Sequence, residues 1–260
     1  MEINKMTVSQ IARLLEEKSI EKAVLAQLQL DSRISVTRLV QKWIRQQAAE
    51  SLEKQRVHNL YQQERSLTQQ GYSLITGVDE AGRGPLAGPV VIAAVILPLN
   101  HYLPCLNDSK KLSPKQREKL YIAIKQAAVA VNHIVVDIDK IDSLNIYQAT
   151  IGGMYQAIAG LKPFPQVALI DAVPLPELAI PSASLIGGDA ISASIAAASI
   201  IAKVERDHLM DKMDQKYPQY GFAKHKGYGT AEHLRALREY GPCPIHRRSF
   251  EPVKSWGDLL

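Results

Sequence analysis

The sequence has little cysteine and no long hydrophobic run. Its two cysteines, Cys105 and Cys243, match no metal-ligand spacing and make no disulfide framework, which indicates a reducing compartment. No apolar run reaches the length of a membrane span, and the first five residues lack the apolar core of a signal peptide. We therefore expect a cytoplasmic protein without a membrane partner. No internal repeat or low-complexity tract is evident.

The overall composition is that of an ordinary globular protein, with 46% hydrophobic and 22% charged residues. A net charge of +5 permits a polyanionic partner but does not require one. The segment from Phe222 to Lys254 contains seven lysines and arginines but three acids, with histidines and aromatic residues interleaved. This mixture fits a nucleic-acid surface, and it fits a solvated helical face equally well.

The first 68 residues are expected to form a helical N-terminal extension. Thr7 can cap a short helix that carries Ile11 and Leu15. A second helical stretch, from Val36 to about Gln70, contains no glycine or proline and spaces its apolar residues helically. It could dock a partner or add a nucleic-acid contact, although an ordinary packed helix is the favoured interpretation.

The pattern changes after residue 69, where strand and helix signals alternate. Apolar runs at 73–79 and 90–97 predict strands, and Ser113-Pro114 predicts a capped helix start. Further expected elements are a helix to about 129, a β-rich stretch at 132–138, a helix at 142–160, short strands at 167–170 and 184–186, and a helix at 191–207. The alternation predicts an α/β domain at 69–260 with a mixed central sheet flanked by helices. Its C-terminal part, about 210–260, is expected to be helical and basic.

A glycine-rich stretch between the first two expected strands is the most informative feature. Asp79 and Glu80 stand at the end of the first strand, and the turn Gly82-Arg83-Gly84 follows. Adjacent carboxylates suit a hard divalent cation. A glycine-flanked arginine suits a phosphate, because the backbone can approach closely while the guanidinium adds charge. Taken alone, an Asp-Glu pair before glycines is more often a solvated turn.

Two further acids occupy comparable positions. Asp171 follows the apolar run Val167–Ile170, and Asp189 follows two glycines before an alanine-rich helix. Alone, Asp171 could equally cap a turn, and Asp189 would more readily serve as a helix N-cap. Strand ends at one edge of an open α/β sheet converge, however, and ligands bind there. Four converging carboxylates would repel one another unless divalent cations offset the charge, so the set predicts a two-metal site for phosphodiester chemistry.

Several motifs together resemble one family. Besides Gly77–Pro89, they are Ile170-Asp171, Gly188-Asp189, Ala196–Asp207, His225–Thr230 and His246–Phe250. In this order, over about residues 71 to 255, they resemble bacterial ribonuclease HII, a type 2 ribonuclease H. The resemblance implies an RNase H-like fold. It also implies an endonuclease that cleaves RNA in RNA–DNA hybrids, incises beside ribonucleotides embedded in duplex DNA, and leaves 5′-phosphate ends.

The resemblance also implies residue roles. The catalytic acids and ligands of Mg²⁺ or Mn²⁺ would be Asp79, Glu80, Asp171 and Asp189. The substrate-binding residues would be Gly82, Arg83, Gly84 and Tyr228, with the tyrosine ring against the ribose. The partners implied are RNA–DNA hybrids and ribonucleotide-containing duplexes, and we expect a monomer. Less specific expectations are phosphate contacts for Lys110, Lys203 and Lys226, a structural ion pair for Asp207, and leaving-group protonation by His225.

The chain departs from the family pattern at one position beside the site. Many bacterial relatives have glycine after the third acid, whereas this chain has Ala172. If the backbone there requires a positive φ angle, alanine is disfavoured. The related ribonuclease HIII family is less similar, because its turn differs from Gly-Arg-Gly.

Two alternatives to a hybrid-cleaving endonuclease stay open. Another nuclease of the same fold, an exonuclease or a polynucleotidyl transferase, would also need clustered acids. It would have no evident use for the Gly82–Gly84 turn together with Tyr228. A non-catalytic nucleic-acid-binding module would bind hybrids without metal-dependent cleavage.

Overall fold

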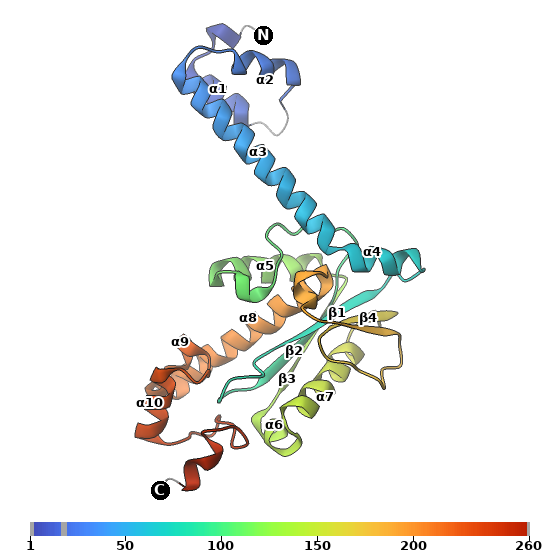
Figure 1. Ribbon diagram of the computed structural model, residues 1–260, viewed down its shortest axis with the longest axis vertical. Coiled ribbons are helices and arrows are strands. Elements are labelled where there is room, and N and C mark those ends of the chain that lie inside the picture. Colours follow the sequence, from blue (N-terminus) through green and yellow to red (C-terminus); the bar gives the residue numbers. More distant parts are fainter. Residues whose placement is uncertain (1–2, 17–19, 259–260) are drawn as a thin grey trace. The chain divides into compact units, whose positions relative to one another are not determined.

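The computed structural model describes residues 3–16 and 20–258 (Figure 1). It divides into two compact units, Met1–Arg56 and Val57–Leu260, each described here by itself. The boundary falls inside the long helix α3 (Ile34–Leu60). The extension expected at 1–68 stays a prediction. No helix among the described residues is both long enough and apolar enough to cross a membrane.

The first unit has a small helical core. A 3-10 turn at Ile3–Lys5 precedes α1 (Val8–Glu16), α2 (Lys22–Gln29) and the first part of α3. The amide of Gln10 donates to Thr7 Oγ1 at 3.3 Å, so Thr7 caps α1 as predicted. The buried apolar residues of this core are Ile3, Ile11, Leu15, Leu28, Val36 and Val40.

The second unit is built on a mixed five-stranded sheet. Its strands are β1 (Ile75–Ala81), β2 (Val90–Ile96), β3 (Ala130–Val136), β4 (Val167–Asp171) and β5 (Ser182–Leu185). They lie in the order β3-β2-β1-β4-β5. β1 pairs antiparallel with β2 and parallel with β4. The predicted α/β fold with a mixed central sheet flanked by helices is therefore confirmed.

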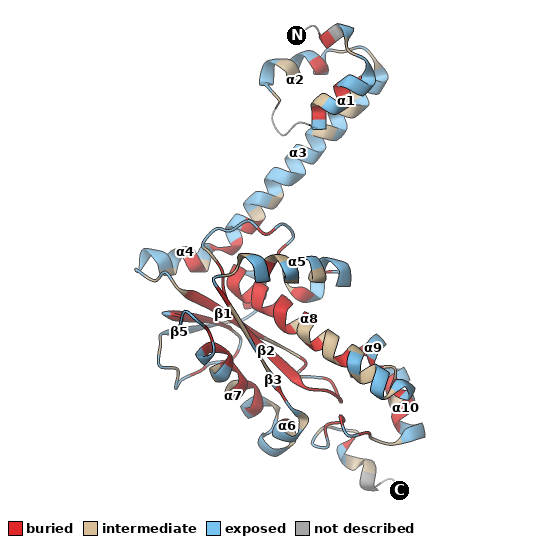
Figure 2. Ribbon diagram, turned by 180° about the vertical axis from the view of Figure 1, so that it is seen from behind, coloured by how far each residue is buried: buried red, intermediate tan, exposed pale blue. Residues whose placement is uncertain are grey.

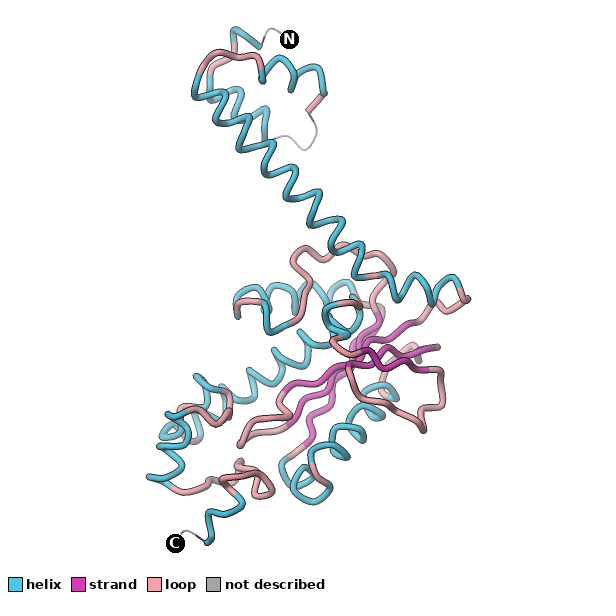
Figure 3. The backbone as a smooth tube through the Cα atoms, viewed as in Figure 1, coloured by secondary structure: helices cyan, strands magenta, loops and turns pink. Residues whose placement is uncertain are grey.

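Helices cover both faces of this sheet (Figures 1 and 3). α5 (Pro114–Ala127) and α8 (Ala193–Lys216) pack on one face, and α7 (Ile146–Ala159) packs on the other. The strand β2 is buried along its whole length (Figure 2), because alternate side chains enter the two cores: Val91, Ala93 and Val95 the first, and Val90, Ile92, Ala94 and Ile96 the second.

The remaining elements are short. They are α4 (Gln62–Gln69), α6 (Ile138–Leu144), α9 (Phe222–His225), α10 (Ala231–Tyr240) and 3-10 turns at Ser109–Lys111, Gly188–Ala190, Pro218–Tyr220 and Lys254–Asp258. α5 begins as the sequence predicts, because Ser113 and Gln116 form a reciprocal capping box with Pro114 in the first turn.

Three predicted helix boundaries were wrong. The helix expected from Val36 to Gln70 breaks at Tyr61, whose buried hydroxyl donates to the carbonyl of His101 at 2.9 Å. The helix expected from 142 begins at Ile146, because Asn145 adopts φ +73° and its side chain caps the next turn. α8 continues past Asp207 to Lys216.

Candidate active site

Two of the predicted acids lie side by side at one edge of the sheet. Val78 in β1 is directly opposite Ile170 in the parallel strand β4, and the next residue in each strand is an acid. Asp79 is buried, with 4% of its surface exposed, and it accepts a hydrogen bond from the Ser199 side chain in α8. The register therefore brings together Asp79 and Asp171, as the sequence predicted.

A turn that begins at a glycine holds Asp189 at the same edge of the sheet. Gly187 has φ +64° and starts the 3-10 turn that carries Asp189. The amide of Gly188 donates to Asp171 Oδ1 at 2.8 Å, which fixes the turn beside the end of β4. The helix-cap interpretation of Asp189 was wrong, because Ser192 is the N-cap of α8 and accepts a hydrogen bond from Ile195.

The acids influence one another's ionisation. Burial, followed by the neighbouring charges of Glu80 and Asp171, raises the pKa of Asp79 well above its ordinary value. Burial also raises the pKa of Glu80, although Arg83 opposes this effect. The pKa of Asp189 is raised to about 6 by burial and by its interactions with Asp108 and Asp171. The site therefore gathers more negative charge than its surroundings neutralise.

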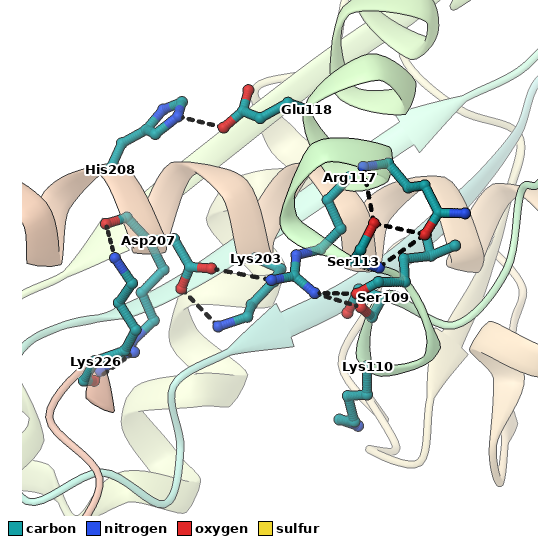
Figure 4. Close-up of polar contacts among 12 residues, drawn as sticks. Ser109, Lys110, Ser113, Arg117, Glu118, Lys203, Asp207, His208 and Lys226 are labelled. Carbon is teal, nitrogen blue, oxygen red and sulfur yellow. Dashed lines mark hydrogen bonds and ion pairs between the residues drawn. The ribbon is translucent and has the colours of Figure 1, made fainter. Parts of the chain in front are cut away.

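One lysine, Lys110, interacts electrostatically with these acids. Burial lowers the pKa of Lys110, but the nearby carboxylates outweigh burial, and the net direction is upward. The contributing acids are Asp189, Asp108, Asp79 and Asp171. Lys110 points away from the contacts around Arg117 (Figure 4). It thus supplies positive charge on the side of the acids and can contact a phosphate held there.

The chemistry of these donors fits a divalent cation. All four acids offer oxygen, the ligand that Mg²⁺ and Mn²⁺ prefer. Glu80 Oε2 is buried and has no hydrogen-bond partner, so it has an unused lone pair inside the site. Within the described residues, no three histidine, cysteine or acidic side chains are already arranged to hold a metal ion. Metal binding therefore requires side-chain movement that draws the oxygens together.

The Gly-Arg-Gly turn follows directly after the acids, and its two glycines have different surroundings. Gly82 has φ +98°, and a Cβ atom there would lie 1.9 Å from Nε of Arg206. Gly84 is open, because the nearest atom to a Cβ would be Cε1 of Tyr228 at 3.8 Å. Between them, Arg83 donates to Glu80 at 3.3 Å. Gly82 is thus required by packing, whereas Gly84 leaves room next to the tyrosine ring.

Tyr228 completes a cavity above this turn. The cavity measures about 190 Å³, and its lining includes Glu80, Arg83, Gly84, Lys110 and Tyr228. The loop that carries the tyrosine is fixed because Leu86 donates a backbone hydrogen bond to Gly227 at 2.8 Å. The Tyr228 side chain itself remains 47% exposed. The four predicted substrate-binding residues therefore share one cavity with Glu80.

Two buried arginines hold the turn, and the sequence did not reveal their role. Arg247 is fully buried and donates to the carbonyls of Gly82, Arg83 and Gly88. Arg206 donates to the carbonyls of Pro89, Ala87 and Lys226. Burial lowers the pKa of Arg206 to about 10 and that of Arg247 to about 9. Arg247 was counted with the basic surface, and that interpretation was wrong. A buried cation that donates hydrogen bonds to three carbonyls has a structural role, because it holds the backbone of the turn in place.

Two of the three lysines expected to contact phosphates, Lys203 and Lys226, form ion pairs with acids. A larger cavity of about 510 Å³ lies beside the first and shares Lys203 with it. There Lys203 pairs with Asp207 at 2.6 Å, and Arg117 approaches the same carboxylate at 3.7 Å (Figure 4). Lys226 pairs with Asp211. Asp207 thus has the structural ion pair predicted for it. Because its cations are already paired with acids, this larger cavity fits an anion less well than the site around Lys110.

The expectation that His225 protonates a leaving group was wrong. Its side chain is 92% buried, since 8% of its surface is exposed. Nε2 lies 2.8 Å from the carbonyl of Tyr220, and Nδ1 accepts from the amide of Gly227 at 3.2 Å. Both ring nitrogens are therefore engaged in holding the loop before Tyr228.

Ser192 and Ser194, at the start of α8, are structural as well. Glu64 in α4 is buried and accepts hydrogen bonds from Ser192 Oγ at 2.7 Å and from the amide of Ser194 at 2.9 Å. Burial raises the pKa of this carboxyl. Glu64 therefore holds the start of α8, next to the turn that carries Asp189, and the sequence gave no signal for this contact.

Ala172 adopts a positive φ angle, the backbone conformation that disfavours alanine. Its φ angle is +52°, where a Cβ atom is strained. We expect Ala172→Gly to raise the free energy of unfolding by about 1 kcal/mol, measured by chemical denaturation. Ala168→Gly, in the regular part of β4, should instead lower it by about 1 kcal/mol. Equal effects of the two substitutions would show that Ala172 is not strained.

Comparisons of the sequence with known proteins find close relatives of this chain. The sequence model described as "Ribonuclease HII" matches residues 76–253, which include all eight predicted site residues, and the one described as "Ribonuclease HII N-terminal domain" matches 7–68. A protein named ribonuclease HII from Desulfitobacterium hafniense (strain DSM 10664 / DCB-2) is 49% identical over 258 residues, 99% of each chain. Another of that name, from Geobacillus thermodenitrificans, is 53% identical over 227 residues, 87% of each chain.

Solved structures show the same fold. The crystal structure of ribonuclease H2 from Pyrococcus horikoshii OT3 matches with a TM-score of 0.61 at 27% identity, covering 71% of this chain and 97% of that one. A structure of Bst-RNase HIII in complex with Mn²⁺ matches with a TM-score of 0.50 at 20% identity, covering 74% of this chain and 71% of that one. The second likeness is one of fold alone.

Proposed function

Because the chain belongs to the ribonuclease HII family, and is therefore an endonucleolytic ribonuclease H of RNA–DNA hybrids, we propose two further properties for it. It requires Mg²⁺ or Mn²⁺, and it also incises beside single ribonucleotides embedded in duplex DNA, leaving 5′-phosphate ends. The observation that carries the proposal is the coupling of four acids at one sheet edge, next to the cavity that contains the Gly82–Gly84 turn and Tyr228.

The acids would hold the metal and the backbone phosphate together. Asp79, Glu80, Asp171 and Asp189 are the proposed ligands. Divalent cations, when bound, supply the positive charge that stabilises the attacking and leaving oxygens of the phosphodiester. Asp79 and Asp171 come from neighbouring strands in fixed register, and Asp189 is tied to Asp171 through Gly188. The backbone thus keeps these acids at one edge of the sheet before the substrate arrives, so that side-chain movement alone would draw their oxygens onto a metal ion.

The turn and the tyrosine would select the ribonucleotide. Telling RNA from DNA requires a contact to the 2′-hydroxyl. The open side of Gly84 allows the backbone to approach a sugar, and the exposed ring of Tyr228 lies next to it. A deoxyribose would leave the polar contact unmade, at a cost of about 1–3 kcal/mol. Because the turn continues directly from Asp79 and Glu80, a sugar that seats well also places the scissile phosphate near the acids.

Tyr228→Ala should therefore impair cleavage at a single embedded ribonucleotide. We expect kcat/KM on that substrate to fall about 10- to 100-fold, because both the ring contact and its hydroxyl are lost. The matched control is Tyr147→Ala on α7, whose side chain is exposed to a similar extent, 42% against 47%. Unchanged incision by the Tyr228 variant would contradict the recognition role given to this residue.

Cleavage of matched duplexes tests the proposed function as a whole. Three duplexes of one sequence, with zero, one or four ribonucleotides, are incubated with Mg²⁺, with Mn²⁺ or with EDTA. The proposal predicts internal incision of the second and third duplexes, with 5′-phosphate products and only when metal is present. End-trimming or strand joining would indicate another nuclease of this fold. Binding without cleavage would indicate a non-catalytic module.

The setting of this activity is also part of the proposal. We propose that the protein acts as a monomer in the cytoplasm on hybrids and ribonucleotide-containing duplexes. We further propose that residues 1–68 form an extension to the catalytic domain at 69–260. Every proposed ligand and substrate contact lies in the second unit, Val57–Leu260, which supports assigning the reaction to the C-terminal part of the chain.

A further inference from the structure

Two buried histidines connect the segment after α10 with the residue that carries the proposed ribose contact. His233 in α10 is fully buried, and His246 has 2% of its surface exposed. Their Nε2 atoms lie 3.0 Å apart. At one end, His233 Nδ1 lies 2.9 Å from the carbonyl oxygen of Tyr228. At the other end, the amide nitrogen of Cys243 lies 3.0 Å from His246 Nδ1. The two rings form a hydrogen-bonded connection, the histidine bridge, between these parts of the chain.

The two ends of the histidine bridge determine where its protons are. The Tyr228 carbonyl can only accept, so His233 donates from Nδ1 and accepts at Nε2. The Cys243 amide can only donate, so His246 accepts at Nδ1 and donates from Nε2. Both requirements agree at the middle bond, where His246 donates to His233. The Cys243 carbonyl lies farther from His246 Nδ1, at 3.3 Å, and donation to it would leave two acceptors facing each other at the middle bond.

The histidine bridge requires neutral rings, because a protonated imidazole donates from both nitrogens. Burial lowers the pKa of His233, and burial together with the neighbouring His233 lowers the pKa of His246 to about 4. Both rings are therefore neutral near pH 7. His225 stacks on His233 with the ring centroids 4.5 Å apart, which holds the His233 ring in its plane.

The residue after His246 holds the opposite side of the same cavity. Arg247 donates to the carbonyls of Gly82 and Arg83, in the turn that lines the cavity together with Tyr228. Two consecutive residues, His246 and Arg247, thus hold the tyrosine loop and the glycine turn. The spacing between the turn and the tyrosine therefore depends on one short segment of the chain.

We propose that the histidine bridge positions the Tyr228 ring against the Gly82–Gly84 turn, so that His233 and His246 are positioning residues for ribonucleotide recognition. The proposal rests on the proposed function, because it takes Tyr228 to contact the ribose. A Cβ atom on Gly84 would lie 3.8 Å from Cε1 of Tyr228, so a small movement of the tyrosine changes the room for a sugar. The Tyr228 carbonyl also accepts from the Thr230 amide at 2.8 Å, but that bond stays within the loop and does not connect it to Arg247.

A double-mutant cycle on the full-length protein tests whether His233 acts through Tyr228. His233→Leu removes both hydrogen bonds of the ring, and kcat/KM on a duplex with one ribonucleotide should fall about tenfold. In a Tyr228→Ala background the same substitution should lower kcat/KM by less than about twofold, because the residue that it positions is already absent. A substitution that only destabilises the protein would lower kcat/KM equally in both backgrounds.

A rescue variant and a matched control accompany the cycle. His233→Asn keeps an N–H donor close to the position of Nδ1, so it should bring kcat/KM back to within about threefold of the wild type. Tyr220→Phe is the matched control, because it removes another buried hydrogen bond of this region, from the Tyr220 hydroxyl to the Gly241 carbonyl at 2.7 Å. It should leave kcat/KM within about twofold of the wild type.

The ring protons of the wild-type protein provide a readout that needs no substrate and no substitution. Long-range ¹H–¹⁵N NMR spectra near pH 7 should show the proton on Nδ1 in His233 and on Nε2 in His246. The opposite tautomers, or a protonated ring, would overturn the proposal. So would wild-type kcat/KM in His233→Leu, or an equal fall with and without the Tyr228 side chain.

The same measurements distinguish failure of this proposal from failure of the proposed function. If the wild type incises no duplex that contains ribonucleotides, the proposed function fails, and the recognition role of the histidine bridge fails with it. If the wild type incises beside the embedded ribonucleotide but His233→Leu has the same effect in both backgrounds, the proposed function stands and His233 does not position Tyr228.

Discussion

Asp79→Asn is expected to lower hybrid cleavage at least about 1000-fold while hybrid binding stays within a fewfold of the wild type. The substitution keeps the size of the side chain but replaces an anionic oxygen by a neutral amide, which weakens metal ligation. Several kcal/mol of transition-state stabilisation depend on the metal ions, and each 1.36 kcal/mol corresponds to a factor of ten in rate. Single-turnover cleavage and equilibrium binding, measured on the same hybrid, separate the two effects.

Stability provides a second readout for this variant. The pKa of Asp79 is raised because burial and neighbouring acids disfavour its charged form. At pH 7 the carboxyl is ionised in the unfolded chain, so a raised pKa in the folded state lowers the stability of the fold, and the neutral asparagine should melt at or above the wild-type temperature. Asp137→Asn is the matched control, because Asp137 is an exposed acid directly after β3 whose side chain caps nothing. An active Asp79→Asn protein would contradict the site assignment.

Gly77→Ala should lower the free energy of unfolding by about 3 kcal/mol or more. A Cβ atom on Gly77 would lie 2.0 Å from the backbone carbon of Ser194 and 2.2 Å from the nitrogen of Ile195. Both atoms belong to the first turn of α8, and backbone cannot rotate aside as a side chain can. The methyl group would push α8 away from β1, and such overpacking commonly costs 1–3 kcal/mol or more. Thermal and urea denaturation measure the loss.

Gly152→Ala is the matched control for this steric effect. Gly152 lies in α7, and a Cβ atom there would meet nothing within 4 Å. Because alanine favours a helix by about 1 kcal/mol over glycine, this variant should be as stable as the wild type or more so. If Gly77→Ala unfolds at the wild-type temperature, α8 does not pack against β1 as closely as described, and the position of Asp189 would need revision.

The sequence predicts the strands and their acids well because strand ends obey simple rules. Buried apolar runs mark β1, β2 and β4. β4 ends at Asp171, and Asp79 lies two residues before the end of β1, so the parallel pairing of the two strands brings these acids together. The capping box at Ser113 is equally local. In each case the information lies within a few residues, which is why pattern reasoning finds it.

Long-range contacts account for most of what the sequence did not predict. Arg247 reaches carbonyls more than 150 residues earlier in the chain, and nothing in its neighbourhood distinguishes it from the exposed Arg248. Glu64 likewise binds Ser192 and Ser194 across 128 and 130 residues. A buried charge is recognised only once its partners are known.

Backbone conformation explains the other differences. Asn145 ends one helix and caps the next because it adopts a positive φ angle, and asparagine is one of the few residues that tolerate it. Ala172 adopts such an angle without that tolerance. The sequence did not predict the conformation of Asn145. That of Ala172 was expected only because the chain resembles relatives that have glycine at this position.

The account depends most directly on divalent cations binding between the four acids. Mn²⁺ titration of the full-length protein, followed by electron paramagnetic resonance, measures this without any cleavage. We predict that the wild type binds Mn²⁺ and that Asp79→Asn and Asp189→Asn each weaken binding at least about tenfold, while Asp137→Asn does not. Wild-type Mn²⁺ affinity in both of the first two variants would contradict the account.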